Sequence, residues 1–232
     1  FVAEFDSSGA LIWVRTIGRQ FEQDRPGGIG LDAAGNVLVT GASMIDQFAG
    51  LPITNHGPIL IAKYSSSGTE LWAIKAGNPS SPRVAAAPGT AGSTIDSGRS
   101  VGIDANGNVY VATSMRALTG TFGGVTLTNT GGADIVVMKL DGNGNAQWVR
   151  QAGGPTDDEV FGIAVDFSGA VFITGDFTSN ATFGSTTLTN ASAFLSDIFV
   201  AKLDASGNWV WARKVGGTSA DGGRDIAVNN NG

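Results

Sequence analysis

The chain has 232 residues, of which 35 are glycine, 42% are hydrophobic and 15% are charged, and it contains no cysteine. A formal net charge of -6 leaves no broad cationic surface, so we expect no nucleic-acid partner. Lack of cysteine excludes disulfides and thiolate metal sites, and the abundance of glycine and β-branched residues favours short strands over helices.

The first predicted element is a hairpin at residues 1–18, "FVAEFDSSGALIWVRTIG". Similar stretches begin at Ile59, Ile135 and Ile198, and each contains a tryptophan near its end. The four tryptophans are Trp13, Trp72, Trp148 and Trp211. Two short apolar runs joined by a polar turn with glycine predict a β-hairpin.

A second kind of hairpin alternates with the first. It reads "GIGLDAAGNVLVTG" from Gly28, "VGIDANGNVYVATS" from Val101 and "GIAVDFSGAVFITG" from Gly162, and "DIAVNNNG" from Asp225 is a partial copy. The strands are apolar on both faces, which indicates small sheets that are covered on both sides. We therefore predict an all-β fold, a β-propeller segment of four-stranded antiparallel blades.

We interpret the whole chain, 1–232, as a single propeller segment, which the repeats divide into blades. We expect a partial blade at 1–18, complete blades at 28–76, 99–151 and 160–214, and a partial blade at 224–232. Unpaired strand edges at both ends promote aggregation unless other strands cover them. We therefore expect further blades of the same chain as partners, with an inner hairpin before Phe1 and a strand after Gly232. Assembly of several copies into one ring is the alternative.

Each blade also carries an excursion between its second and third strands. The excursions contain "FAGLPITN", "FGGVTLTN" and "FGSTTLTN", at 48–55, 122–129 and 183–190. Up-and-down connectivity places them on one rim with the link at 78–94, and long loops on a rigid scaffold are where binding usually resides. This long-loop rim is the predicted working face. The alternative is that Phe48, Phe122, Phe183, Ile53, Leu127 and Leu188 only cap the blades with apolar surface.

The patterns D-I-F-V-A-K-L-D-x-x-G-x-x-x-W, I-A-V-D-x-x-G-N-V-Y-V-T-G and F-G-x-x-x-L-T-N together resemble the repeat of bacterial β-propeller proteins of the SBBP type. The resemblance covers nearly the whole chain. It implies a bacterial protein that is secreted or displayed at the cell surface, often large and multidomain, and it leaves the function open. Glu4 and Pro58 depart from the repeat, so we do not expect identical sites in all blades.

An aspartate recurs eight residues before the inner turn of each repeat. The four residues are Asp24, Asp96, Asp158 and Asp221. Propeller symmetry predicts that they form a collar near the axial opening, which would suit a polar ligand or calcium. The alternative is structural: each aspartate accepts backbone N–H bonds or pairs with the recurrent Arg15, Arg150 and Arg213.

Two further residues are candidates for ligand binding. His56, the single histidine, lies in an excursion, and Trp209 has no counterpart in the other copies. The turns at 104–108 and 141–145 resemble half of a calcium loop but lack its distant glutamate, so we expect turn chemistry there. No catalytic residue is predicted, and calcium is the one cofactor considered.

The sequence thus predicts a non-enzymatic exported or cell-surface β-propeller that acts as a binding or scaffold module for a protein or glycan. No apolar run reaches the roughly 18 residues that cross a bilayer, so we expect no membrane insertion. The alternative function is a carbohydrate-active enzyme using rim carboxylates. Four equivalent aspartates argue against it, because acid–base catalysis needs two carboxyls in different environments.

Overall fold

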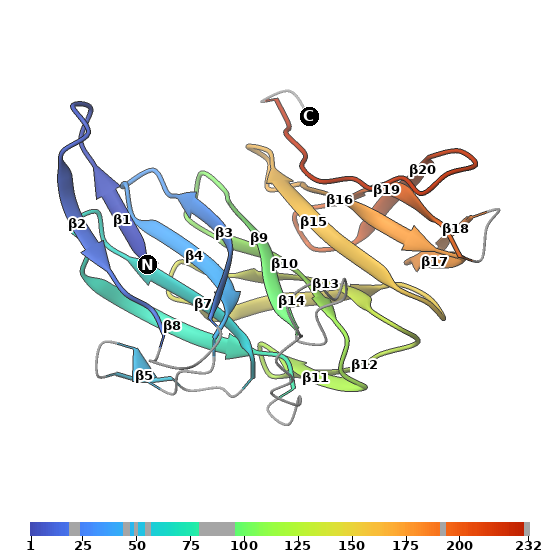
Figure 1. Cartoon of the computed structure of the whole chain (residues 1–232), viewed down its shortest axis with the longest axis horizontal. Helices are drawn as coiled ribbons and strands as arrows, with labels where there is room; N and C mark the ends of the chain where they lie inside the picture. The colour runs from blue at the N-terminus through green and yellow to red at the C-terminus, as the bar shows by residue number, and fades with distance from the viewer. Residues whose placement is uncertain are drawn as a thin grey trace.

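The computed structural model describes residues 1–18, 24–43, 47–48, 51–53, 57–78, 96–190 and 194–229. Within these ranges the chain forms strands and turns without a helix (Figure 1), which confirms the predicted all-β fold class. It follows that no described segment is a helix long and apolar enough to span a membrane.

Three four-stranded antiparallel sheets follow one another along the chain, and each sheet keeps its strands in chain order. The first contains β3 (Arg25–Leu31), β4 (Val37–Ala42), β7 (Ile59–Tyr64) and β8 (Glu70–Ala76). The second contains β9 (Ser97–Ile103), β10 (Val109–Met115), β13 (Asp134–Leu140) and β14 (Ala146–Ala152). The third contains β15 (Asp158–Val165), β16 (Val171–Thr178), β19 (Ser196–Leu203) and β20 (Trp209–Val215). These sheets are the propeller-like blades, and a two-stranded sheet, β1 (Val2–Phe5) with β2 (Leu11–Arg15), precedes them.

The inner strands β3, β9 and β15 contact one another but share no hydrogen-bonded ladder. Their backbones touch at Gly27 and Gly98, since a Cβ on Gly27 would lie 1.8 Å from the carbonyl oxygen of Gly98. Any side chain at Gly27 would therefore push the first two blades apart. Between blades, packing replaces the hydrogen bonds that hold each blade together.

The segment after β20 differs from the prediction. Residues 224–229 have the sequence of an inner strand, but no strand forms between 216 and 229. The segment still lies against β15, because a Cβ on Gly162 would be 2.9 Å from the Cα of Asp225. Each inner strand pairs with the second strand of its own blade. The described residues after Asp225 include no second strand, so this segment has no strand to pair with.

Each blade contacts the next through a tryptophan of its outermost strand. The indole N–H of Trp72 donates to the carbonyl of Gly142, 3.0 Å away in the β13–β14 turn of the following blade. The same contact joins the other neighbours, Trp13 with Ser66 and Trp148 with Ala205, both at 3.2 Å. The tryptophan series is therefore explained by packing between blades.

The same turns bring a glycine against each tryptophan ring. Gly207 has a φ of 81°, and a Cβ there would lie 2.7 Å from Cδ2 of Trp148. Gly68 is similarly placed on the ring of Trp13, with a φ of 75°. Glycine is needed twice over, for the left-handed backbone and for the space that the indole occupies.

Glu4, which departs from the repeat, lies opposite a tryptophan in the outer hairpin of its blade. Lys63, Lys139 and Lys202 stand opposite Trp72, Trp148 and Trp211. In the first copy Glu4 takes this place, and its carboxylate accepts the indole N–H of Trp13 at 2.6 Å. The carboxylate at this position thus adds a second acceptor for that indole.

The excursions fold into small hairpins, and the second and third of these bridge two blades. They are β5 (Gln47–Phe48) with β6 (Leu51–Pro52), β11 (Thr119–Phe122) with β12 (Val125–Thr128), and β17 (Asn180–Phe183) with β18 (Thr186–Thr189). Thr121 and Gly77 exchange two backbone hydrogen bonds of 2.9 and 3.1 Å, as do Thr182 and Gly153 at 2.9 and 3.2 Å.

Apolar side chains of the excursions face the core. Phe122, Phe183, Ile53 and Leu188 are buried, and Leu127 is partly buried. The side chain of Phe48 lies outside the described set. The apolar residues of the excursions therefore cover the blades, as the structural alternative required.

The turns that resemble calcium half-loops are capped by their own aspartates. Asp141 accepts the backbone N–H groups of Asn143 and Asn145, both at 2.9 Å, and Asp104 accepts those of Asn106 and Asn108. Hydrogen bonds from Asn145 lower the pKa of Asp141. The oxygen-rich side chains thus serve the turns, as expected.

We expect Trp148→Ala to lower the free energy of unfolding by about 2–3 kcal/mol, because a half-buried ring and an interblade hydrogen bond are lost. Trp211→Ala is the matched control, since its indole N–H makes no hydrogen bond within the described part of the chain, and it should cost less. Urea denaturation measures both. Equal losses in the two variants would contradict the proposed interblade role.

Candidate functional site

The predicted collar aspartates lie at the corners where one blade passes into the next. Asp96 and Asp158 are fully buried. Asp158 accepts the backbone N–H of Gly154 at 2.7 Å, Asp221 accepts that of Gly217 at 2.9 Å, and Asp96 accepts that of Arg116 at 2.6 Å. The carboxyl groups of Asp96, Asp158 and Asp221 therefore accept backbone N–H groups, as the structural alternative predicted for these aspartates.

The structural alternative also predicted that the collar aspartates pair with Arg15, Arg150 and Arg213, and this prediction is wrong. Arg150 donates from Nε to the carbonyl of Gly207, 2.7 Å away in the turn of the next blade, and Arg15 pairs with Glu70 at 3.6 Å. Arg213 donates to the carbonyl of Ala212. Arg150 lies two residues beyond Trp148, so it projects from the same face of its strand toward the neighbouring turn instead of the corner.

The corner between the second and third blades buries two carboxyl groups. A Cβ on Gly153 would lie 2.5 Å from Oδ1 of Asp134 and 3.2 Å from Oδ2 of Asp158. Burial raises the pKa of Asp158 to about 8, and the charge of Asp134 acts in the same direction. Burial also raises the pKa of Asp96. At neutral pH the Asp158 carboxyl is therefore mainly protonated.

Within the described part of the chain, the collar aspartates are not grouped together. Among the described residues, no three acidic or histidine side chains are grouped so that they could hold a metal. His56 lies outside the described residues. Trp209 is half-buried, with its ring edge-on to Phe183 at a centroid distance of 5.3 Å. The ring of Trp209 is thus engaged by the excursion hairpin of its own blade and is not a free surface aromatic.

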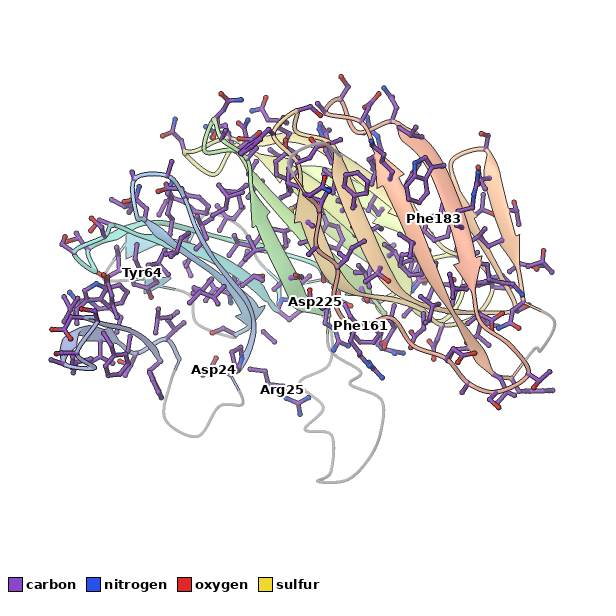
Figure 2. The ribbon with its side chains drawn as sticks, turned by 90° about the horizontal axis from the view of Figure 1, so that it is seen from above. Asp24, Arg25, Tyr64, Phe161, Phe183 and Asp225 are labelled. Carbon is purple, nitrogen blue, oxygen red and sulfur yellow. The ribbon has the colours of Figure 1, made fainter. Side chains whose placement is uncertain are left out.

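A cavity of about 300 Å³ at the start of the inner strands holds residues that sequence analysis missed. Its charged and aromatic lining is Arg25, Arg99, Phe161 and Arg224, which we call the arginine mouth. Figure 2 shows Arg25 and Phe161 on the same side of the molecule, near Asp24. This end of the inner strands belongs to the long-loop rim.

The arginine mouth is built from equivalent positions of the repeat. Arg99, Phe161 and Arg224 each stand three residues after a corner aspartate, and Gly27 holds that position in the first blade. Arg25 instead follows its corner aspartate directly. Recurrence of arginine at this position in two copies was the signal available in the sequence.

Cation–π contacts organise the mouth. The guanidinium carbon of Arg224 lies 4.6 Å from the ring centroid of Phe161, and that of Arg99 lies 5.3 Å from it. Arg99 comes from β9, on one side of β15, and Arg224 from the segment on the other side. Phe161 is therefore a shared platform for two cations.

Carboxylates lie behind this platform. Glu159 contacts Arg99 at 3.5 Å and also pairs with Arg116, which in turn pairs with Asp157 at 3.0 Å. Glu159 and Asp176 are partners in the β15–β16 ladder. Burial, together with the charge of Glu159, raises the pKa of Asp176 to about 6.

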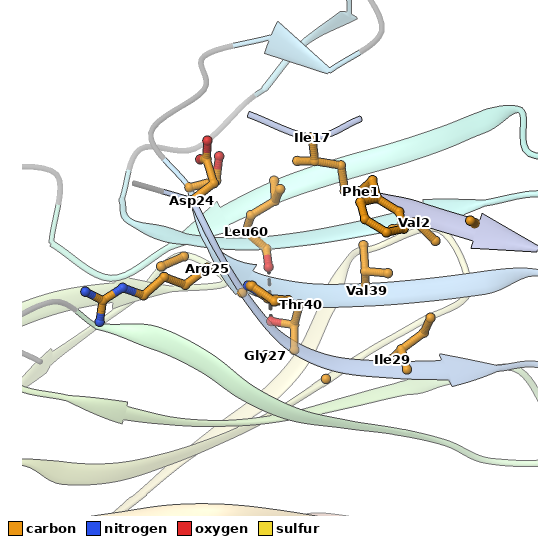
Figure 3. A pocket seen from close by; sticks show the side chains of 16 residues that line it. Phe1, Val2, Ile17, Asp24, Arg25, Gly27, Ile29, Val39, Thr40 and Leu60 are labelled. Atoms are coloured by element: carbon orange, nitrogen blue, oxygen red, sulfur yellow. Dashed lines mark hydrogen bonds between the residues drawn. The ribbon is translucent and has the colours of Figure 1, made fainter. Parts of the chain in front are cut away.

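A second cavity of about 300 Å³ lies between β1 and the strands β3 and β4 of the first blade. Figure 3 shows its apolar lining, including Val39 and Leu60, with the guanidinium of Arg25 directed away from it. Ile29 is 64% exposed beside this cavity, whereas the equivalent Val101 and Ile163 are 8% and 7% exposed because a preceding inner hairpin covers them. The cavity therefore lies where the other junctions hold an inner hairpin. The expected hairpin before Phe1 stays a prediction.

Comparison with known proteins supports the repeat in part of the chain. A family model described as a beta-propeller repeat, SBBP, matches residues 147–180. This stretch runs from β14 across the blade junction to the first excursion strand of the third blade. No curated protein matches the chain.

The buried Asp158 gives a prediction for the pH dependence of stability. Its pKa rises from 3.8 to about 8 on folding, so the folded state holds an extra proton between these values and stability falls as pH increases. We expect the free energy of unfolding to decline from pH 5 to pH 8, and Asp158→Asn to make the decline shallower.

Urea denaturation at several pH values in that range measures the slope. Asp204→Asn is the matched control, because hydrogen bonds from Asn208 lower the pKa of this turn carboxylate and its titration falls below the range. An unchanged slope in Asp158→Asn would show that this carboxyl is ionised in the folded protein.

Proposed function

We propose that the chain is a non-enzymatic binding module and that its ligand enters at the arginine mouth. One observation carries the proposal: arginines from three of the four inner segments line one cavity in a chain whose net charge is -6. A local concentration of cations in a concave site attracts a ligand of opposite charge. The mouth lies on the long-loop rim, where the excursions add further surface.

The proposed setting is a bacterial protein that is secreted or held at the cell surface, with a protein or glycan as ligand. The SBBP-type repeat and the propeller-like blades support this setting by resemblance. The blades also suit a scaffold, because their interblade contacts hold one rigid face toward a partner.

A carbohydrate-active enzyme is the second candidate, and one observation favours it. Glu159 and Asp176 are neighbouring carboxyls in different environments: Glu159 pairs with two arginines, whereas burial raises the pKa of Asp176 to about 6. Glycoside hydrolysis uses two carboxyl groups in different environments.

Binding is tested on an array of neutral and acidic oligosaccharides and short peptides. We expect at least one ligand to bind the wild-type chain and Arg213→Ala, and to lose most of its signal with the Arg99→Ala/Arg224→Ala double variant. Arg213 is a suitable control because it is exposed on the outermost strand. Equal binding by the double variant, or no binding by any protein, would contradict the proposed site.

The enzymatic candidate predicts hydrolysis of an aryl glycoside that Glu159→Gln slows at least about 100-fold. Release of the aryl group is followed by absorbance, with Arg213→Ala as the control. If no substrate in a broad panel is cleaved by the wild-type chain, the binding module stands alone.

A further inference from the structure

We infer that the arginine mouth recognises the carboxylate of an acidic protein side chain. This inference rests on the proposed function, because it names the chemical class of ligand for the same site. It is carried by the guanidinium geometry, the local charge balance and the size of the cavity.

The guanidinium groups are arranged to donate hydrogen bonds from their edges. Arg99 and Arg224 each have the guanidinium near the ring of Phe161, which leaves N–H groups for a partner in the guanidinium plane. A planar carboxylate matches this fork of donors. The Nε of Arg99 is buried without a hydrogen-bond partner among the described residues, so one donor of the site is unsatisfied.

The carboxylates near the mouth are divided unevenly among its arginines. Glu159 is shared between Arg99 and Arg116, and Asp157 pairs with Arg116. Arg224 forms no ion pair within the described part of the chain, and its electrostatic partner behind the platform is the partly buried Asp176, which Arg99 also influences. Asp225, beside it in sequence, uses a carboxylate oxygen to accept the backbone N–H of Ile226 at 2.8 Å. One added carboxylate could therefore form a close ion pair with the Arg224 guanidinium, which forms none within the described part of the chain.

The same features disfavour polyanions and sugars as ligands. A polyanion would be repelled by a chain of net charge -6 as more of its charges approached. A sugar usually needs an aromatic face, but the ring of Phe161 already has two guanidiniums over it. The cavity of about 300 Å³ is at the small end of ligand sites, which suits a single side chain.

The test is an NMR titration of the full chain at pH 7 with the capped tripeptide acetyl-Gly-Asp-Gly-amide and its Asn analogue. We expect saturable shifts of amides around Phe161 with the Asp peptide and none with the Asn peptide. Arg99→Ala and Arg224→Ala should each weaken binding roughly tenfold, because each removes a charge-assisted hydrogen bond. Arg224→Lys should also weaken binding, because lysine keeps the positive charge but lacks the paired N–H donors of a guanidinium. Arg213→Ala should not change binding.

Glucuronate and inorganic phosphate are titrated in parallel. Tighter binding of either one than of the Asp peptide, with the same arginine dependence, would overturn the choice of an acidic side chain. Equal binding of the Asn peptide, or no shift with the Asp peptide, would overturn carboxylate recognition. The oligosaccharide and peptide array tests the proposed function separately. If a neutral ligand binds there and depends on Arg99 and Arg224, the proposed binding site is supported although carboxylate recognition is wrong.

Discussion

The contact between a tryptophan and the turn of the next blade is the interaction on which this structure depends. Blades share no strand ladder, so their mutual position rests on side chains and backbone that meet between sheets. Trp72 and Trp148 each donate to a turn carbonyl of the following blade, and a turn glycine lies on the ring. Because the ring, the donor and the turn must all fit, each blade can take one position against its neighbour.

That fixed position explains why a site can form from single residues of separate blades. The inner strands begin side by side, so a residue at a given distance from the corner aspartate meets its equivalents from other blades. The repeat keeps the scaffold constant, while Gly27, Arg99, Phe161 and Arg224 occupy one equivalent position with different chemistry. The site is therefore asymmetric although the blades are alike.

The corner aspartates show how a repeated polar residue can serve the scaffold. Their carboxyls accept backbone N–H groups that no strand ladder satisfies, and the cost of burying Asp158 appears as its raised pKa. Asp176 is also buried with a raised pKa, but it lies beside Glu159 and the arginines of the mouth. Burial alone thus does not distinguish the structural carboxyls from those near the candidate site; their neighbours do.

The sequence by itself determined the four-stranded blades, the hairpin turns and the interblade role of the tryptophans. These features depend on local alternation, turn chemistry and a period, which a linear pattern contains. The tertiary structure decided that the collar aspartates are separate corner groups, that Arg150 reaches the next turn, and that 224–229 packs without a strand. It also decided that Arg25, Arg99 and Arg224 share one cavity with Phe161. Such contacts join residues more than 50 positions apart, and their partners are set by the angle and distance between blades, which no local pattern specifies.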